Sequence, residues 1–173
     1  MSSWSLGISA VLLSLERICY LWAWHAPASF RNFCEHPAVA PCGEPIQVLQ
    51  KLFYGFKVIQ LTVFFGWCYW YGGLSGETLW VGVGSTLILA GQLLNFSVFY
   101  RLGKVGVFYG IKFGYQVPWC HKFPFSLLKH PQYVCTLVSI WGFFLAMRFP
   151  YEDWFMLPTL QTAYYVLAAR LEQ

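Results

Sequence analysis

The stretch that decides the fold runs from Thr78 to Tyr100 and reads TLWVGVGSTLILAGQLLNFSVFY. It contains no charged residue, and it is long enough for a helix to cross the hydrocarbon, which takes about 20 mostly apolar residues. Similar runs occupy Trp4 to Trp24 and Leu52 to Tyr71, and shorter ones occupy Tyr133 to Met147 and Trp154 to Leu171. The sequence therefore predicts four to five transmembrane helices.

The composition of the chain leads to the same class. Of the 173 residues, 58% are hydrophobic, 21% aromatic and only 10% charged, so one soluble core cannot bury the apolar surface. Only helices and closed barrels pair all backbone groups in hydrocarbon, and these runs lack the alternation of barrel strands. We predict an all-α polytopic membrane protein, whose last two helices form a hairpin around the turn at Arg148 to Asp153. We expect a single integral membrane domain, with amino-terminal helices in residues 1–77 and a core that carries the polar segment in 78–173.

Basic residues collect between the third and fourth apolar runs. They are Arg101, Lys104, Lys112, Lys122 and Lys129, and no acidic residue lies between Glu77 and Glu152. Because cytoplasmic loops are enriched in Lys and Arg, this polar segment is expected to face the cytosol. Alternation then places residues 26–50 on the same side and the loop Gly72 to Glu77 on the opposite side. It also returns Glu172 to the cytosolic face, where it can contact the polar segment.

Charge and cysteine usage narrow the range of partners. The net charge of +4 does not indicate nucleic acid, because the few positive charges lie at helix ends instead of forming a basic face. Anionic lipid headgroups are the expected partner. The six cysteines show no CxxC pair, so we predict neither a zinc site nor a disulfide framework and expect no metal. They are Cys19, Cys34, Cys42, Cys68, Cys120 and Cys135. The oligomeric state stays open.

Glycines recur through the first half of the polar segment, at Gly103, Gly106, Gly110 and Gly114. Glycine lets the backbone approach a ligand closely or adopt a positive φ. The spacing of the last three equally matches the small-xxx-small pattern by which membrane helices pack. On spacing alone, helix packing and cofactor contact are equally supported.

The end of the polar segment, His130-Pro131-Gln132-Tyr133, is typical of a helix start. Free N–H groups at such a start favour an anion, although His130 and Lys129 can equally serve to anchor the helix at the interface. Glu172 ends an apolar helix, where the helix dipole disfavours negative charge. A positive group that compensates it and simple solvation are the two alternatives.

Several short motifs follow one another in a fixed order from Gly91 onward. They are GQLLNF from Gly91, LGKVGVFYG from Leu102, KFG from Lys112, then Pro118-Trp119, Phe123-Pro124-Phe125 and HPQYV from His130. In this order and at these separations they resemble the small phospholipid N-methyltransferases, especially the plant type. The amino-terminal third is compatible with that family and less diagnostic.

The resemblance implies transfer of methyl groups from S-adenosylmethionine to phosphatidyl-N-methylethanolamine and its dimethyl form, giving phosphatidylcholine at the cytosolic face of the endoplasmic reticulum membrane. It implies cofactor contacts at Gly91, Gly103, Gly106, Tyr109, Gly110, His130, Pro131, Tyr133 and Glu172. Animal relatives have Gly-x-Gly where this chain reads Leu89-Ala90-Gly91, and a carboxylate pair where it reads Glu172-Gln173. Similarity to the plant type suggests that unmethylated phosphatidylethanolamine is not accepted, and this stays open.

Methyl transfer is an in-line displacement on a sulfonium carbon, so the enzyme mainly has to align the amine with the donor. The amine must first lose a proton, and the candidate bases are His130, His121 and Glu172. Candidates for binding the lipid phosphate are Arg101, Lys112 and Lys122, which the positive-inside bias explains equally well. Aromatic faces attract sulfonium and ammonium groups, and aromatic residues also anchor proteins at the interface. The aromatic residues of this region are Tyr109, Phe113, Tyr115, Trp119, Phe123, Phe125 and Tyr133.

Two other classes remain open. One is another enzyme on a similar scaffold, either a prenylcysteine carboxyl methyltransferase or a sterol-type reductase with a nicotinamide cofactor. The other is a non-enzymatic subunit whose glycines pack helices. Phe123 to Phe125, with Asn95 and the glycine spacing, favours the phospholipid enzyme. Glu16 and Arg17 inside the first run are expected to form an interhelical pair, because ionisable residues are costly in hydrocarbon, and a gate for the lipid headgroup is the alternative.

Overall fold

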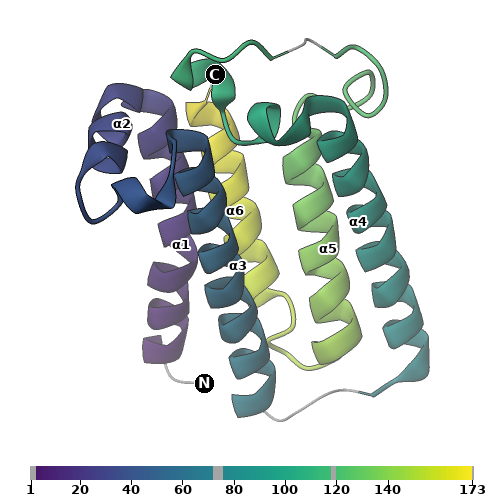
Figure 1. The fold of residues 1–173 in the computed structure, drawn as a ribbon. Helices are drawn as coiled ribbons and strands as arrows, with labels where there is room; N and C mark the ends of the chain where they lie inside the picture. The colour runs from purple at the N-terminus through teal and green to yellow at the C-terminus, as the bar shows by residue number, and fades with distance from the viewer. Residues whose placement is uncertain (1–2, 72–75, 118–119, 173) are drawn as a thin grey trace.

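The computed structural model describes residues 3–71, 76–117 and 120–172, and these contain helices and no strands. The predictions for Gly72 to Ser75, Pro118, Trp119 and Gln173 lie outside the described residues. Figure 1 shows the long helices side by side, in directions that alternate along the chain. They are α1 (Ser3–His25), α3 (Pro45–Trp70), α4 (Thr78–Val107), α5 (Pro131–Arg148) and α6 (Met156–Leu171). Three short elements join them: α2 (Pro27–Glu35), η1 (Ala40–Cys42) and η2 (Gly110–Phe113).

Three stretches of the described chain are long and apolar enough to cross a membrane: Trp4–His25, Pro45–Trp70 and Thr78–Phe113. The predicted final hairpin is formed by α5 and α6, which have 18 and 16 residues. At 1.5 Å per residue these helices measure roughly 27 and 24 Å, slightly less than the roughly 30 Å of hydrocarbon. The all-α polytopic fold is confirmed, and a fourth or fifth crossing by the hairpin stays a prediction.

The alternating helices place the connections at two ends of the bundle (Figure 1). One end of the bundle holds residues 26–44, 108–117 and 120–130 and the carboxyl-terminal end of α6. We call it the basic end, because it carries Lys104, Lys112, Lys122 and Lys129 of the polar segment. The amino terminus and the turn between α5 and α6 lie at the opposite end. This is the alternation that the sequence predicted, so Glu172 and the polar segment do share an end. That the basic end faces the cytosol stays a prediction.

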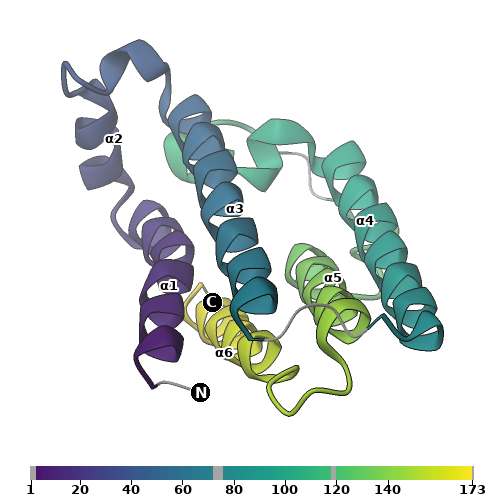
Figure 2. The ribbon, with the colours of Figure 1, turned by 90° about the horizontal axis from the view of Figure 1, so that it is seen from below.

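Seen from below, α4 lies at one edge beside α5, α1 lies at the other side, and α3 and α6 lie between them (Figure 2). Glycines allow the close approach of α4 and α5. A Cβ atom at Gly84 would lie 2.4 Å from the carbonyl oxygen of Gly142, and one at Gly91 would lie 2.7 Å from that of Cys135. Small residues at such contacts are the usual means by which membrane helices pack closely. Small-residue packing therefore occurs between α4 and α5, whereas Gly110 and Gly114 lie beyond the end of α4.

A buried ion pair fixes the turn at the far end of the hairpin. Arg148, which is 1% exposed, has its Nη2 2.5 Å from Asp153 Oδ1 and donates to the carbonyl of Tyr71 at 2.8 Å. Trp67 Nε1 donates to Asp153 Oδ2 at 2.6 Å. These bonds join α3 to both ends of the hairpin turn, and they satisfy charges that would be costly to bury alone.

Candidate active site

A cavity of about 490 Å³ lies at the basic end, a volume within the range of small-molecule sites, about 300 to 1,000 Å³. We call it the Glu172 cavity. Of the residues predicted from the sequence to form the site, those that line it are Gly106, Tyr109, His121, His130, Pro131, Tyr133 and Glu172. They come from the end of α4, the polar segment, the first turn of α5 and the end of α6. The structure thus brings together residues that are up to 66 positions apart in the chain, counting from Gly106 to Glu172.

Two backbone conformations carry the chain from α4 into the cavity wall. Gly103 adopts φ 62° and interrupts the helical geometry near the end of α4. Tyr109 adopts the left-handed conformation, with φ 55°, immediately before η2. This region favours glycine and is uncommon for other residues. The kink and the turn bring the polar segment back over the basic end and place the Tyr109 ring inside the bundle.

The carboxylate of Glu172 is held by two tyrosine hydroxyls. Tyr109 donates to Oε1 at 2.7 Å and Tyr133 donates to Oε2 at 2.5 Å. Hydrogen bonds to an ionised group are stronger than neutral ones. The predicted contact between the chain end and the polar segment is therefore confirmed. Among the described residues no basic side chain forms an ion pair with Glu172, so tyrosine hydroxyls bind the carboxylate, which is neither of the two alternatives taken from the sequence.

Aromatic contacts hold both tyrosines in place. The Tyr109 ring packs edge-on against Trp24 and Tyr20, with centroids 5.2 and 5.4 Å away. The Tyr133 ring stacks on His130 at 5.7 Å. Nε2 of His130 is buried and has no hydrogen-bond partner in the described part of the chain. The cavity therefore combines a fixed carboxylate, aromatic faces and an imidazole nitrogen that is free to bind or take up a proton.

Other predicted site residues lie outside the cavity wall. Gly91 sits in the contact between α4 and α5, where its missing side chain is needed for packing. Gly103 forms the kink, and Gly110 is buried against Val105. We therefore assign these glycines to shaping the backbone, and direct contact of any of them with a cofactor remains a prediction without support from their position.

The three basic residues predicted to bind the lipid phosphate also lie outside the cavity wall. Arg101 Nε donates to the carbonyl of Phe123 at 3.3 Å, and Lys112 Nζ lies 3.8 Å from the ring centre of Trp24. Lys122 is exposed. Lys129 lines the cavity instead.

Sequence reasoning missed part of the wall. Val98 and Leu102 line the cavity together with Gly106. Val98 and Leu102 are four residues apart before the kink at Gly103, so these two lie on one face of α4. This spacing is a signal in the sequence, but apolar residues occur on every face of a membrane helix and the pair is not distinctive there. Trp24 and Gln132 are further wall residues that had no assigned role.

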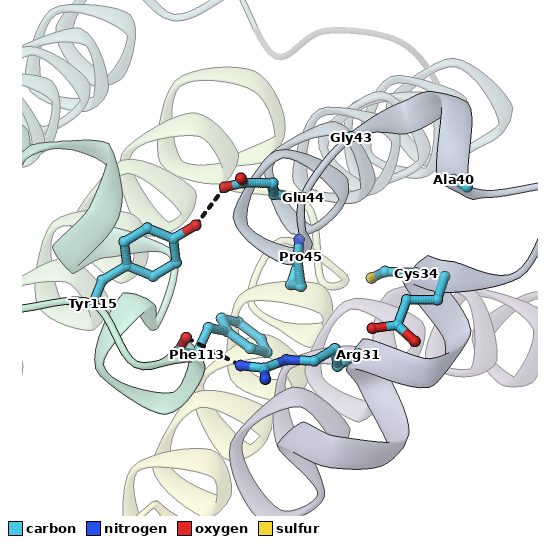
Figure 3. A pocket seen from close by; sticks show the side chains of 9 residues that line it. Arg31, Cys34, Ala40, Gly43, Glu44, Pro45, Phe113 and Tyr115 are labelled. Carbon is cyan, nitrogen blue, oxygen red and sulfur yellow. Dashed lines mark hydrogen bonds between the residues drawn. The ribbon is translucent and has the colours of Figure 1, made fainter.

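A second cavity of about 490 Å³ lies between α2, the start of α3 and η2. Figure 3 shows Arg31 reaching under Pro45 to the carbonyl of Phe113, to which Nη2 donates at 3.1 Å. It also shows the Tyr115 hydroxyl donating to Glu44, a bond that raises the pKa of Tyr115. None of the candidate bases lines this cavity. Residues of this second cavity can therefore serve as control positions when residues of the Glu172 cavity are substituted.

The fold and the cavity define the class, which is an all-helical membrane protein with a cavity of small-molecule size at one end of its helix bundle. Comparison with known proteins gives the family. The sequence model of the phospholipid methyltransferase family matches residues 79–173, which carry all the residues of the Glu172 cavity wall except Trp24. The chain is also 31% identical over 136 residues to the phosphatidyl-N-methylethanolamine N-methyltransferase of Arabidopsis thaliana, covering 77% of this chain and 74% of that relative. No solved structure gives a significant match. The chain belongs to the phospholipid methyltransferase family and is a methyltransferase, as the motifs predicted.

Proposed function

We propose that this chain transfers methyl groups from S-adenosylmethionine to the amines of phosphatidyl-N-methylethanolamine and phosphatidyl-N,N-dimethylethanolamine, forming phosphatidylcholine. We place the reaction in the endoplasmic reticulum membrane, with the Glu172 cavity facing the cytosol. Family membership and the activity that names the Arabidopsis relative support the reaction. The structural observation that supports the site is the Glu172 carboxylate, held by two tyrosine hydroxyls in a cavity at the basic end.

The residues of the Glu172 cavity fit the methyl donor. S-adenosylmethionine brings a methyl group on a positively charged sulfur, together with an ammonium and a carboxylate. The carboxylate of Glu172 and the faces of Tyr109 and Tyr133 suit the cationic groups. The first turn of α5, which begins at Pro131, suits the anionic group, because the helix dipole favours negative charge there. The volume of about 490 Å³ is adequate for a ligand of this size.

Proton removal from the lipid amine falls to His130 in this proposal. Its Nε2 is buried and unpaired, and the residue lines the cavity beside Tyr133. A general base must lie within hydrogen-bond reach of the proton it takes. Both oxygens of Glu172 already accept hydrogen bonds, so we assign Glu172 to holding the donor. His121 also lines the cavity but is exposed, which makes it the second candidate.

The lipid acceptor is expected to meet Lys129 and the apolar part of the wall. Lys129 is the basic side chain of the described wall, and a compact ammonium group suits a phosphate. Leu102, Ile111 and Leu128 supply apolar surface. Leu127, the neighbour of Leu128, is 76% exposed, as expected of a side chain that enters the lipid. In this arrangement the headgroup reaches the donor while the acyl chains stay in the membrane.

The reaction is tested with purified protein, methyl-labelled S-adenosylmethionine and four acceptors offered separately. These are phosphatidylethanolamine, its monomethyl and dimethyl forms, and a prenylated cysteine. We expect label in the monomethyl and dimethyl lipids and none in the prenylcysteine, and the result with phosphatidylethanolamine decides whether the first methylation is included. No label in any lipid with folded protein would refute the proposal.

The proton acceptor is tested by comparing three variants in the same assay. His130→Gln is expected to lower kcat, by about 10² to 10⁴-fold if His130 is the general base. His36→Gln changes an exposed histidine outside the cavity and serves as the matched control. A loss in His121→Gln with normal turnover in His130→Gln would move the role to His121.

A further inference from the structure

Helix α1 carries two neighbouring charged residues, Glu16 and Arg17, which are only 5% and 8% exposed. They lie within one of the candidate membrane spans. Ionisable residues in hydrocarbon are costly, and they generally pair with one another or mark a functional polar region. The reaction proposed above gives neither residue a role.

Glu16 takes part in two ion pairs. Arg17 Nη2 lies 2.5 Å from Glu16 Oε1, and Lys57 Nζ of α3 lies 3.1 Å from Oε2. Lys57 Nζ also donates to Gln60 Oε1 at 2.9 Å. The predicted interhelical pair therefore exists, with Lys57 as the partner of Glu16. Since one carboxylate faces two cations, the group keeps a surplus positive charge inside the bundle.

The guanidinium of Arg17 lies against three tyrosine rings, and one of them, Tyr133, also lines the Glu172 cavity. Its Cζ lies 4.1, 5.1 and 5.6 Å from the ring centres of Tyr165, Tyr20 and Tyr133. Arg17 Nη2 also donates to the Tyr165 hydroxyl at 3.3 Å. A guanidinium over aromatic faces is attracted most strongly where water is excluded. Tyr133, whose hydroxyl holds Glu172, is thus in contact with Arg17 through its ring.

A void of about 20 Å³ lies between the ion pair of Glu16 and Arg17 and the two tyrosines that bind Glu172. Glu16, Arg17 and Tyr20 line it together with Tyr109 and Tyr133. Arg17 Nε and the Tyr20 hydroxyl are buried and have no hydrogen-bond partner in the described part of the chain. The ionic group and both tyrosines that hold Glu172 therefore share one buried space, where charges act on each other more strongly than in water.

We propose that Arg17 is a positioning residue for methyl transfer. Its guanidinium, neutralised in part by Glu16, holds the Tyr133 ring and through it orients the Glu172 carboxylate toward the donor. Lys57 fixes Glu16 from α3 and so fixes Arg17. This inference rests on the proposed function, because the binding of S-adenosylmethionine is the property that Arg17 improves.

The test is a double-mutant cycle on purified protein in phosphatidylcholine nanodiscs that also contain phosphatidyl-N-methylethanolamine as the methyl acceptor. Wild type, Arg17→Gln, Glu172→Gln and the double variant are compared for binding of S-adenosylhomocysteine, for the KM of S-adenosylmethionine and for kcat. We expect Arg17→Gln to weaken binding about tenfold and to have little further effect once Glu172 is Gln. Arg17→Lys, which keeps the charge and loses the planar fork, is expected to recover part of the affinity.

A matched control comes from the other buried arginine. Arg148→Gln removes another buried charge, at the opposite end of the bundle, and we expect it to lower the thermal stability while showing no coupling to Glu172→Gln. If Arg17→Gln does not fold, the same cycle is run with Arg17→Lys. If the effects of Arg17 and Glu172 are additive, or if donor binding by a folded Arg17 variant is unchanged, the inference is overturned. Wild-type protein that neither binds S-adenosylhomocysteine nor methylates lipid would overturn the proposed function itself, so the two failures are distinct.

Discussion

The substitution Tyr133→Phe removes one of the two hydrogen bonds that hold Glu172 and leaves the rest of the site in place. The hydroxyl that is lost donates to Glu172 Oε2 at 2.5 Å, while Tyr109 still donates to Oε1 at 2.7 Å. The phenyl ring keeps its stacking on His130 and its edge contact with Tyr165, at 5.7 and 5.2 Å. The variant therefore removes one hydrogen bond to the carboxylate, together with the longer contact of 3.3 Å between the Tyr133 and Tyr109 hydroxyls.

The free energy lost with this hydrogen bond depends on the charge of its acceptor, the Glu172 carboxylate. Hydrogen bonds to charged groups contribute about 1.5 to 3 kcal/mol. Because Tyr133 and Glu172 are only half-buried, we take the lower part of this range, about 1.5 to 2 kcal/mol. This corresponds to a fall in kcat/KM of about 10- to 30-fold, since about 1.4 kcal/mol is a factor of ten. The fall in kcat/KM is expected to come mainly from a higher KM for S-adenosylmethionine, because the carboxylate binds the donor before reaction.

The assay measures initial rates of methyl transfer at varied donor concentration, with thermal unfolding measured alongside. Tyr115→Phe is the matched control, because it removes a hydroxyl that donates to a carboxylate in the second cavity. We expect its kcat/KM to equal that of wild type. Equal kcat/KM for Tyr133→Phe and wild type, at equal stability, would refute the role given to the Tyr133 hydroxyl.

Three further predictions concern packing, orientation and pH. Gly84→Ala should lower the free energy of unfolding by about 1 to 3 kcal/mol, because its Cβ would lie 2.4 Å from the Gly142 carbonyl oxygen; unchanged thermal stability would contradict the close packing of α4 and α5. A glycosylation acceptor placed in the turn at residues 149–155 should be modified in microsomes and one placed at the exposed Lys122 should not, and the reverse pattern would invert the proposed orientation. Because its hydrogen bond to Glu44 raises the pKa of Tyr115, the stability from this bond is present below the ordinary tyrosine pKa of about 10 and is lost as pH rises through the raised pKa. Stability of wild type should therefore fall more steeply at alkaline pH than that of Tyr115→Phe, and parallel curves would contradict this.

The fold was predictable because its main determinant is local in the sequence. Long apolar runs specify membrane helices one at a time, and alternation across the membrane then fixes which connections share an end. That reasoning placed Glu172 beside the polar segment before any contact was known. The hydrogen bonds from Tyr109 and Tyr133 confirm this placement.

The details of the site were less predictable, because they depend on backbone turns and on side-chain direction. Tyr109 reaches Glu172 only because the kink at Gly103 and the left-handed conformation of Tyr109 itself redirect the chain. A tyrosine is not a residue from which a positive φ would be expected. Charge alone likewise did not show that Lys112 lies over Trp24 while Lys129 lines the cavity.

The packing glycines show a third limit. The spacing of Gly106, Gly110 and Gly114 suggested helix packing, yet only Gly106 belongs to α4. The close contact is made by Gly84 and Gly91, which are seven residues apart and face Gly142 and Cys135 of α5. Glycine spacing shows that a helix can pack closely, but it does not show which other helix it packs against. That partner could not be identified from one sequence.

The central claim is that methyl transfer to lipid takes place in the cavity where Glu172 is held. The most direct measurement compares wild type with Glu172→Gln, using labelled S-adenosylmethionine and phosphatidyl-N-methylethanolamine, with Glu44→Gln in the second cavity as the matched control. We predict that wild type and Glu44→Gln label the lipid at equal rates and that Glu172→Gln, at equal stability, loses kcat/KM by about tenfold or more. Normal labelling by Glu172→Gln together with loss of labelling in Glu44→Gln would contradict this claim and move the reaction to the other cavity.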